Sequence, residues 1–397
     1  MPVYHEDTPD EAVIQLNPGL DFPRYLGSID VRRYDLDEVT NQIIEGIRQS
    51  NNPAYLFQSR GQMARLEADE HGVPRLQEMT PDRVMHLVAR QQRCYRVDRR
   101  GDEQPAPPSY QVAKNVLASP LCVVGLPVVE RVVGFPAYNR RGILQIEPGY
   151  YPASGTIYAP PSGYFPPPIP ERPSPDIVSW AKENIAELFH DFPFVSEADR
   201  AAAIALLLLP IIRDLIEGPT PLHLGHKPKG GTGGTLLAHV CCFPALGAWP
   251  SSTAPPEHES EWDRTITALL CSGVPVLLFD NAQELRSRAL ASAITSASQM
   301  GRVVRTSTVA CAEARCVWVA TGNNVVLSDE IARRTLPIRL DAKMEHPERR
   351  TEFLHPHLRD WVAAQRDVIQ FSCFALVENW LAKGQPAGRK RLGGFEH

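Results

Sequence analysis

A glycine-rich heptapeptide at residues 229–235, Lys-Gly-Gly-Thr-Gly-Gly-Thr, has the composition of a phosphate-binding loop. Backbone N–H groups of such a loop can surround a phosphate, and the hydroxyl of Thr235 can reach a bound Mg²⁺ ion. The motif normally ends in Gly-Lys-Ser/Thr, but Gly234 stands where the lysine is expected. The ammonium that neutralises the β- and γ-phosphates is therefore missing from its usual place. We predict an ATP site made of Lys229, Gly230, Gly231, Thr232, Gly233, Gly234, Thr235 and Leu236.

Two lysines, one just before the heptapeptide and one at its first position, could supply the missing charge. They are Lys227 and Lys229, and the string Lys-Gly-Gly-Thr-Gly resembles the deviant loop of partition-type ATPases, in which a front lysine works beside the usual one. Nothing downstream resembles that family, so the alternative is that both are solvated loop lysines. Removing one transition-state stabiliser can lower a rate on the order of 10²–10³-fold. We therefore expect inefficient hydrolysis with weak nucleotide binding retained; a loop that is only a structural turn is the other interpretation.

Two apolar segments further along the chain end in polar residues. Residues 274–279 run into Asp280, and residues 316–320 run through a Thr-Gly pair into Asn323 and Asn324. Because the carboxyl ends of adjacent parallel strands meet at one edge of a sheet, we expect these side chains beside the phosphate loop. Asp280 would hold Mg²⁺ together with the threonine of the loop, directly or through water. One of the two asparagines would orient the attacking water or touch the γ-phosphate.

The order of elements predicts an α/β fold. Apolar strands alternate with helical segments after residue 176, which favours a doubly wound parallel sheet. Sixteen of the 37 prolines fall between Pro105 and Pro175, and proline blocks helix interiors, so we expect loops and short strands there. We predict a small α+β domain (winged-helix-like and DNA-binding, or a structural cap), a Pro-rich β connector, a P-loop core and a C-terminal helical segment. Their bounds are 1–104, 105–175, 176–345 and 346–397.

Local patterns predict individual elements within these segments. Apolar spacing and capping residues predict helices at 37–49, 81–91, 176–189, 197–216 with a break at Pro210, and 235–242. A hairpin is expected to turn at Arg60-Gly61. In the connector, brief strands at 142–146 and 155–158 are expected to flank a turn at Gly149-Tyr150.

Bulk composition limits the function classes. The net charge of −5 implies no overall attraction to nucleic acid, so such contacts need a local basic surface. Eight cysteines lack metal-ligand spacing, which favours free thiols, although a bridge between Cys311 and Cys316 stays open. The start of the chain is acidic and polar rather than a signal peptide, and the apolar run at 201–209 is too short to cross a bilayer. We expect a cytoplasmic protein with no metal beyond Mg²⁺.

The layout of these motifs resembles AAA+ ATPases. From about residue 50 onward, the chain resembles more narrowly the helicase-type ATPases of phages and integrative mobile elements, often labelled primase/helicase. Short pieces in a shared order carry this resemblance: residues 231–238, Glu261 with 264–268, 278–281, 320–324, Arg333-Arg334 with 337–340, 347–349 and 392–396.

The resemblance implies an ATP- and Mg²⁺-dependent motor for DNA replication. Such ATPases form homo-oligomeric rings that translocate on single-stranded or forked DNA. By the same resemblance, Arg333 or Arg334 acts as an arginine finger on a neighbouring subunit's nucleotide. Asn281 stands where many AAA+ motors carry a catalytic glutamate, so the base comes from elsewhere, with Glu261 as a candidate. Arginines on a pore hairpin would contact DNA phosphates, or else lie solvated on the surface; they are Arg302, Arg305 and Arg315.

Two departures from the family keep a second hypothesis open. Gly234 replaces the family's lysine, and family members usually continue beyond the position of His397, so we expect a truncated form or a missing final module. The first hypothesis is a DNA motor impaired at Gly234. The second is a non-hydrolysing, nucleotide-responsive DNA-binding or scaffold subunit. A Gly234→Lys substitution should raise ATPase activity strongly if the rest of the site is intact.

Overall fold

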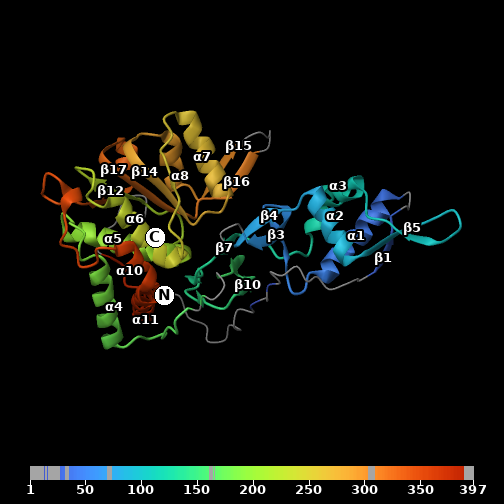
Figure 1. Ribbon diagram of the computed structural model, residues 1–397, viewed down its shortest axis with the longest axis horizontal. Helices are drawn as coiled ribbons and strands as arrows, with labels where there is room; N and C mark the ends of the chain where they lie inside the picture. Colours follow the sequence, from blue (N-terminus) through green and yellow to red (C-terminus); the bar gives the residue numbers. More distant parts are fainter. Residues whose placement is uncertain are drawn as a thin grey trace. The chain divides into compact units, whose positions relative to one another are not determined.

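The computed structural model describes residues 13, 16, 27–31, 35–68, 74–160, 164, 166–302 and 309–388 (Figure 1). The chain divides into two compact units, each with its own core. One comprises residues 1–134 with 147–164, and the other comprises residues 135–146 with 165–397. The proline-rich stretch predicted as a connector therefore contributes to both units.

The first unit is built from three helices and short strands. Its helices are α1 (Leu36–Ser50), α2 (Pro81–Gln91) and α3 (Tyr110–Ala118), with the 3-10 turn η1 (Pro120–Val123). Its strands are β1 (Ser28–Asp30), β2 (Leu56–Ser59), β3 (Gln62–Ala68), β4 (Pro74–Glu78), β5 (Arg93–Val97), β6 (Glu103–Pro105), β7 (Arg131–Val133), β10 (Gly149–Tyr151) and β11 (Thr156–Tyr158).

Sequence patterns predicted α1, α2, the β2–β3 hairpin and β11, because the signals of these elements are local. The side chain of Thr80 accepts a hydrogen bond from the first turn of α2, as the predicted helix start requires. The predicted hairpin is confirmed, since β2 and β3 pair antiparallel on either side of Arg60-Gly61. The predicted turn at Gly149-Tyr150 is wrong. These residues form β10, which pairs antiparallel with β11, and the burial of Tyr150 and Tyr151 favours a strand over an exposed turn.

The second unit is organised around a five-stranded parallel sheet. Its strands are β12 (Leu222–Lys227), β13 (Ser252–Thr253), β14 (Val276–Leu285), β17 (Val317–Leu327) and β18 (Thr335–Arg339). Their order is β13-β14-β17-β12-β18, and all neighbours run parallel. The predicted α/β core with a parallel sheet is confirmed. The chain leaves β12 toward one edge of the sheet and returns on its other side as β18, and such reversal points are where open α/β sheets bind ligands.

Helices and short connecting elements complete the second unit. They are β8 (Ala137–Tyr138), β9 (Leu144–Gln145), α4 (Pro175–Leu188), α5 (Glu197–Ile212), η2 (Arg213–Leu215), α6 (Gly234–Leu246), α7 (Glu259–Cys271), α8 (Arg288–Thr295), β15 (Ser298–Arg302), β16 (Val309–Glu313), α9 (Asp329–Ala332), η3 (Pro347–Arg349), α10 (Leu358–Ala364) and α11 (Arg366–Ala382). The predicted break of α5 at Pro210 is wrong. The helix continues to Ile212, because Leu209, Pro210 and Ile211 are buried and proline near a helix end removes only one hydrogen bond.

One large apolar cluster joins the sheet to α7 and α8. Trp318 of β17 is 1% exposed, and the rings of Trp262 and Phe279 lie 4.9 Å apart. Cys316 is a buried free thiol, so the structure has no Cys311–Cys316 bridge. Within the described ranges, no helix combines the length and apolar character needed to span a bilayer.

Candidate functional site

Residues 228–233, here called the glycine loop, connect β12 to the first residue of α6. Gly231 and Gly233 have φ angles of 78° and 94°, which side chains disfavour, so glycine is required at both positions. The N-cap residue of α6 is Gly233, which has no side chain to cap the first turn. The unpaired N–H groups of a helix start, together with its dipole, favour an anion.

The glycine loop is packed closely from two sides. A Cβ at Gly231 would lie 3.0 Å from the backbone nitrogen of Glu348 in η3. A Cβ at Gly233 would lie 3.5 Å from the ring of Phe192. That ring belongs to a cluster with Phe189 and Phe194, with centroids 5.9 to 6.3 Å apart. The loop is therefore held in one conformation by its surroundings as well as by its glycines.

The structure brings Thr235 and Asp280 together as the sequence predicts. The Thr235 hydroxyl donates a 2.8 Å hydrogen bond to Asp280 Oδ1, and the fully buried Thr321 donates to the same oxygen. Adjacent strands make this possible, because β14 carries Asp280 and β17, between β14 and β12, carries Thr321. A hydroxyl and a carboxylate thus face each other beside the N-terminus of α6.

These two oxygens fit a Mg²⁺ ion of the kind that accompanies nucleotides. Mg²⁺ keeps several water ligands and takes one or two protein oxygens plus substrate phosphates. Across the described part of the chain, no group of three or more His, Cys, Asp or Glu side chains could hold a metal ion. Thr235 and Asp280 would hold Mg²⁺ here, and its charge would neutralise phosphate oxygens.

Asn323 and Asn324 lie beside the glycine loop, and Asn281 follows Asp280. Asn324, at φ 47°, donates from its amide nitrogen to the carbonyl oxygen of Pro228 at 3.0 Å. The amide nitrogen of Asn323 lies 3.9 Å from where a Cβ of Gly230 would be. Asn281, at φ 58°, follows Asp280 and donates its backbone N–H to that carboxylate.

The two lysines differ sharply in their surroundings. Lys227, the last residue of β12, is only 7% exposed. Burial lowers the pKa of Lys227, although the negative charge of Asp280 acts to raise it. Lys229 is exposed, and its charge is felt by the carboxylate of Glu348.

Two residues near this site were missed at the sequence level. His239 lies one turn after Thr235 on α6, and its Nδ1 is 2.7 Å from the Arg359 guanidinium of α10. The Arg359 guanidinium also lies 5.3 Å from the centre of the Trp249 ring. Burial and the charge of Arg359 lower the pKa of His239, and Asp280 acts to raise it. The spacing of His239 from Thr235 was the available signal, whereas Arg359 is 120 residues away and gave none.

Three residues that the sequence predicts as catalytic lie away from the glycine loop of the same chain. They are Arg333, Arg334 and Glu261. The carbonyl oxygen of Arg334 accepts from the backbone nitrogen of Leu222, at the start of β12, and Arg333 adjoins it. The glycine loop follows the other end of β12. The two ends of this strand are about 16 Å apart, because each strand residue adds about 3.3 Å. Glu261 is exposed in the first turn of α7, which packs on α8, β15 and β16.

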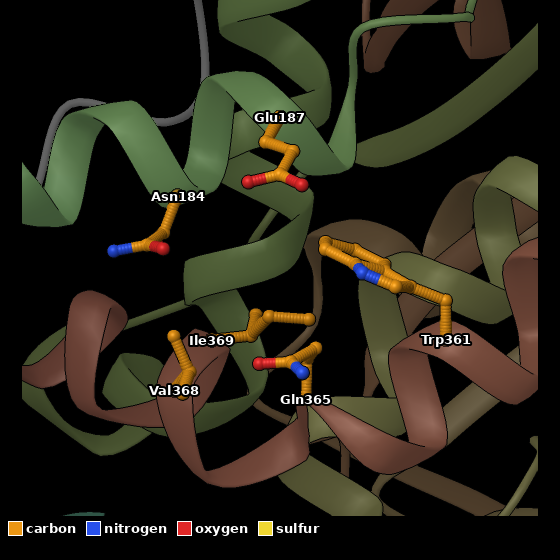
Figure 2. A pocket seen from close by; sticks show the side chains of 6 residues that line it. All are labelled: Asn184, Glu187, Trp361, Gln365, Val368 and Ile369. Atoms are coloured by element: carbon orange, nitrogen blue, oxygen red, sulfur yellow. The ribbon is translucent and has the colours of Figure 1, made fainter. Parts of the chain in front are cut away.

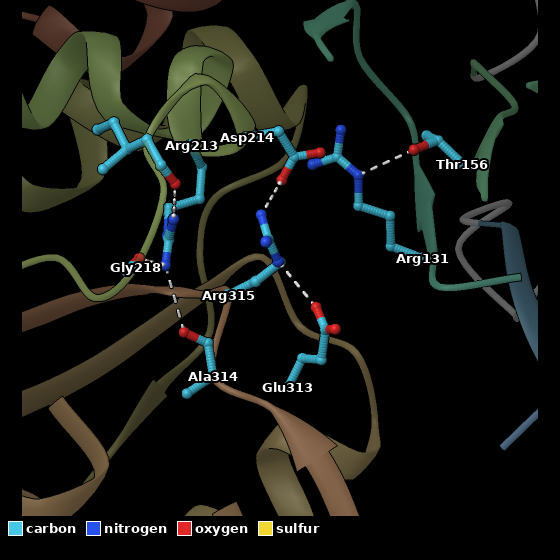
Figure 3. A network of polar contacts seen from close by, with 9 residues as sticks. Arg131, Thr156, Arg213, Asp214, Gly218, Glu313, Ala314 and Arg315 are labelled. Carbon is cyan, nitrogen blue, oxygen red and sulfur yellow. Dashed lines mark hydrogen bonds and ion pairs between the residues drawn. The ribbon is translucent and has the colours of Figure 1, made fainter. Parts of the chain in front are cut away.

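The arginines predicted to contact DNA are only partly described. Arg305 lies outside the described residues, and only the backbone of Arg302 is described, at the end of β15. Arg315 pairs with Glu313 at 2.8 Å and with Asp214 at 3.4 Å (Figure 3). Its charge is used within the chain, which ties the start of β17 to η2. The basic turn at residues 389–391 also lies outside the described residues.

Away from the glycine loop, a hollow lies between α4, α10 and α11 (Figure 2). It has a volume of about 180 Å³ and no lining residue from the glycine loop. Beside it, His355 Nε2 lies 3.0 Å from Glu187 and the imidazole stacks on Trp361 at 4.0 Å. The lining residues are Asn184, Glu187, Trp361, Gln365, Val368 and Ile369.

The fold and this site define an α/β protein with a parallel sheet compatible with a P-loop core. No protein-family model and no curated protein sequence matches the chain. Among solved structures, the chain has 13% identity to "SCCmec type IV Cch - active helicase", covering 81% of this chain at a TM-score of 0.34. It has 12% identity to "The X-ray structure of JCV Helicase", covering 52% of this chain and 61% of that one at a TM-score of 0.22. The chain spans 58% of the length of the first of these two helicases.

Proposed function

We propose that this protein binds ATP with Mg²⁺ at the glycine loop and the start of α6, and acts as an AAA+ helicase-like DNA-replication protein of a phage or mobile element. The hydrogen bond between Thr235 and Asp280 is the observation that carries the proposal. It sets the Asp280 carboxylate of β14 against the hydroxyl of Thr235, in the first turn of α6, whose N-cap residue is Gly233.

Each part of this arrangement has a role in holding a triphosphate. Backbone N–H groups of the glycine loop and α6 surround the phosphates, which needs no side chain. Thr235 and Asp280 hold Mg²⁺. Asn323, exposed beside Gly230, contacts the terminal phosphate or orients water, while Asn324 fixes the start of the loop through Pro228.

The motor function further needs several copies of the chain. Arg333 and Arg334 lie at the amino end of β12, so only a neighbouring subunit's arginines could meet the bound nucleotide. A homo-oligomer, closed into a ring on single-stranded or forked DNA, satisfies this requirement. The basic residues that we propose for the DNA contact are Arg302, at the end of β15, and Arg305, which follows it in the sequence.

The nucleotide part is tested by binding of a fluorescent ATP analogue with Mg²⁺. We expect Asp280→Asn to weaken Mg²⁺-dependent binding at least tenfold. Asp176→Asn, which removes an exposed carboxylate in the first turn of α4, is the matched control and should bind like the wild type. Equal binding by the Asp280→Asn variant and the wild type would overturn the proposed site.

A second candidate function follows from Gly234. A P-loop without its usual lysine is expected to lose transition-state stabilisation more than binding. A non-hydrolysing, nucleotide-responsive DNA-binding or scaffold subunit is therefore the alternative. ATPase measurement with and without single-stranded DNA separates the two, because a motor is stimulated by DNA and a scaffold subunit shows binding without turnover.

A further inference from the structure

We propose that Lys227, at the end of β12, provides the phosphate-binding ammonium that is absent from position 234. This inference rests on the proposed nucleotide site and names the cation of that site. The lysine of a P-loop normally extends from the helix that follows the loop. Here the charge would come from the strand that precedes it.

The pleat of β12 directs Lys227 toward the N-terminus of α6. Side chains two residues apart share one face of a strand, so Lys227 faces the same way as Gly225. A Cβ at Gly225 would lie 3.6 Å from the carbonyl oxygen of Gly234, the first residue of α6. The face of β12 that carries Lys227 is therefore the face on which α6 begins.

The side chain of Lys227 lies directly against Gly234. A Cβ at position 234 would be 3.2 Å from Cδ, 3.4 Å from Cε and 3.5 Å from Nζ of Lys227. The end of the Lys227 side chain, including the ammonium, therefore lies in contact with the position from which a side chain at 234 would extend. Glycine at 234 leaves the Lys227 side chain uncrowded there.

Lys227 is also a buried lysine, with a residue exposure of 7%. Among the described residues its side chain makes no hydrogen bond or ion pair, and the negative charge of Asp280 acts on it without a direct contact. Burying an unpaired ammonium destabilises a fold, and such groups concentrate at functional sites. A triphosphate at the uncapped start of α6 is the anion that would pair with it.

The neighbouring Lys229 does not meet these conditions. It is exposed, and its charge helps to lower the pKa of Glu348 on η3. Because Lys229 lies within the proposed glycine loop, the control is the exposed Lys182 of α4, which has the same chemistry and lies outside the proposed site.

The experiment compares Lys227→Met with Lys182→Met by MgATP binding and by thermal unfolding. Charge-assisted hydrogen bonds to phosphate imply a roughly 10- to 100-fold loss of affinity for Lys227→Met, against less than threefold for Lys182→Met. Lys227→Met should also unfold at a higher temperature than the wild type without nucleotide, because it removes a buried charge. A lysine with a merely structural role would lower that temperature.

A double variant tests whether a lysine at position 234 can replace the lysine at position 227. We expect Gly234→Lys alone to bind MgATP no better than the wild type, because its Cβ meets the Lys227 side chain and two ammoniums would share one space. Lys227→Met with Gly234→Lys should recover the affinity lost in Lys227→Met. Strong gain from Gly234→Lys alone would contradict the inference.

The outcomes separate this inference from the function on which it rests. A wild type that binds neither MgATP nor inorganic tripolyphosphate overturns both. A wild type that binds while Lys227→Met binds equally well overturns the role of Lys227 alone. If Lys227→Met does not fold, the rate of lysine acetylation in the wild type decides the question. MgATP should slow the acetylation of Lys227 and leave that of Lys182 unchanged, and unaltered rates at both lysines would refute the role of Lys227.

Discussion

Gly230 and Gly231 are adjacent, yet the structure gives them opposite tolerance for a side chain. A Cβ at Gly231 meets the backbone of Glu348 at 3.0 Å and the residue has a φ of 78°, whereas a Cβ at Gly230 finds only the Asn323 amide at 3.9 Å. We predict that Gly231→Ala weakens binding of a fluorescent ATP analogue by at least tenfold, because the loop must move. Gly230→Ala should change it less than threefold. Equal effects would mean that the loop conformation is not what binding requires.

The lowered pKa of Lys227 gives nucleotide binding a pH dependence. A bound triphosphate favours the ammonium, so binding takes up a proton once the pH exceeds the pKa of the nucleotide-free protein. MgATP affinity should therefore fall as the pH rises through that pKa, which burial sets below the ordinary 10.5. Lys227→Arg stays protonated and should flatten the profile measured by titration between pH 7 and 10.

Other charged groups near Lys227 do not produce the same dependence. A backbone hydrogen bond lowers the pKa of Glu348 on η3, so this carboxylate keeps its charge above neutral pH. Asp280 of β14 is the carboxylate whose charge acts on Lys227. His239 of α6 has a pKa lowered by burial and by Arg359, so it is already neutral in this range. A profile that is equally steep in Lys227→Arg would assign the dependence to a group other than Lys227.

Among the elements, β18 is fixed to α5 by one ion pair. Asp199, 1% exposed, accepts two hydrogen bonds from the Arg339 guanidinium at 2.9 and 3.1 Å and one from Ser196 at 2.5 Å. Burial acts to raise the pKa of Asp199, but these hydrogen bonds outweigh it and hold the pKa below its usual 3.8. The pair therefore stabilises the fold above about pH 4, and the contribution is lost as the pH falls through the lowered value.

Asp199→Asn should lower the free energy of unfolding by about 1.5–3 kcal/mol at pH 7, the usual range for hydrogen bonds to a charged group. Urea denaturation at pH 7 and pH 3 checks this, and the difference from the wild type should shrink at the lower pH. The exposed Asp176→Asn serves as the control. A difference that is the same at both pH values would show that the carboxylate charge is not the cause.

The sequence predicted the elements whose signals are local or repeated along the chain. Continuous apolar runs ending in Asp280 and Asn323 were enough to predict neighbouring parallel strands. The path of α5 through Pro210 was missed because burial on α6 decides it. The choice between Lys227 and Lys229 was also open, because it depends on where β12 ends and on the face that its last residue shares. Arg359 could not be predicted, since only tertiary packing brings it to His239.

At the scale of the whole molecule, the proposed homo-oligomer predicts that Arg333 and Arg334 of one copy act on the nucleotide of another. We predict that a variant with both arginines changed to alanine binds MgATP within threefold of the wild type but has little ATPase activity. Asp280→Asn should also be inactive. Mixing the two inactive proteins should restore part of the ATPase activity, measured by phosphate release. The intact arginines of one copy can then contact the intact nucleotide site of another copy. No recovery in mixed oligomers would place the arginines outside the reaction.

The contact between Lys227 and Gly234 also bears on how such proteins are found. Motif searches compare the order of letters along a chain, whereas a phosphate responds to the location of charge in space. If Lys227 supplies the charge from seven residues upstream of Gly234, the charge stays near the phosphate site although the sequence motif is lost. Chains dismissed for a broken Gly-Lys-Thr signature are therefore worth inspecting for a lysine at the end of the preceding strand.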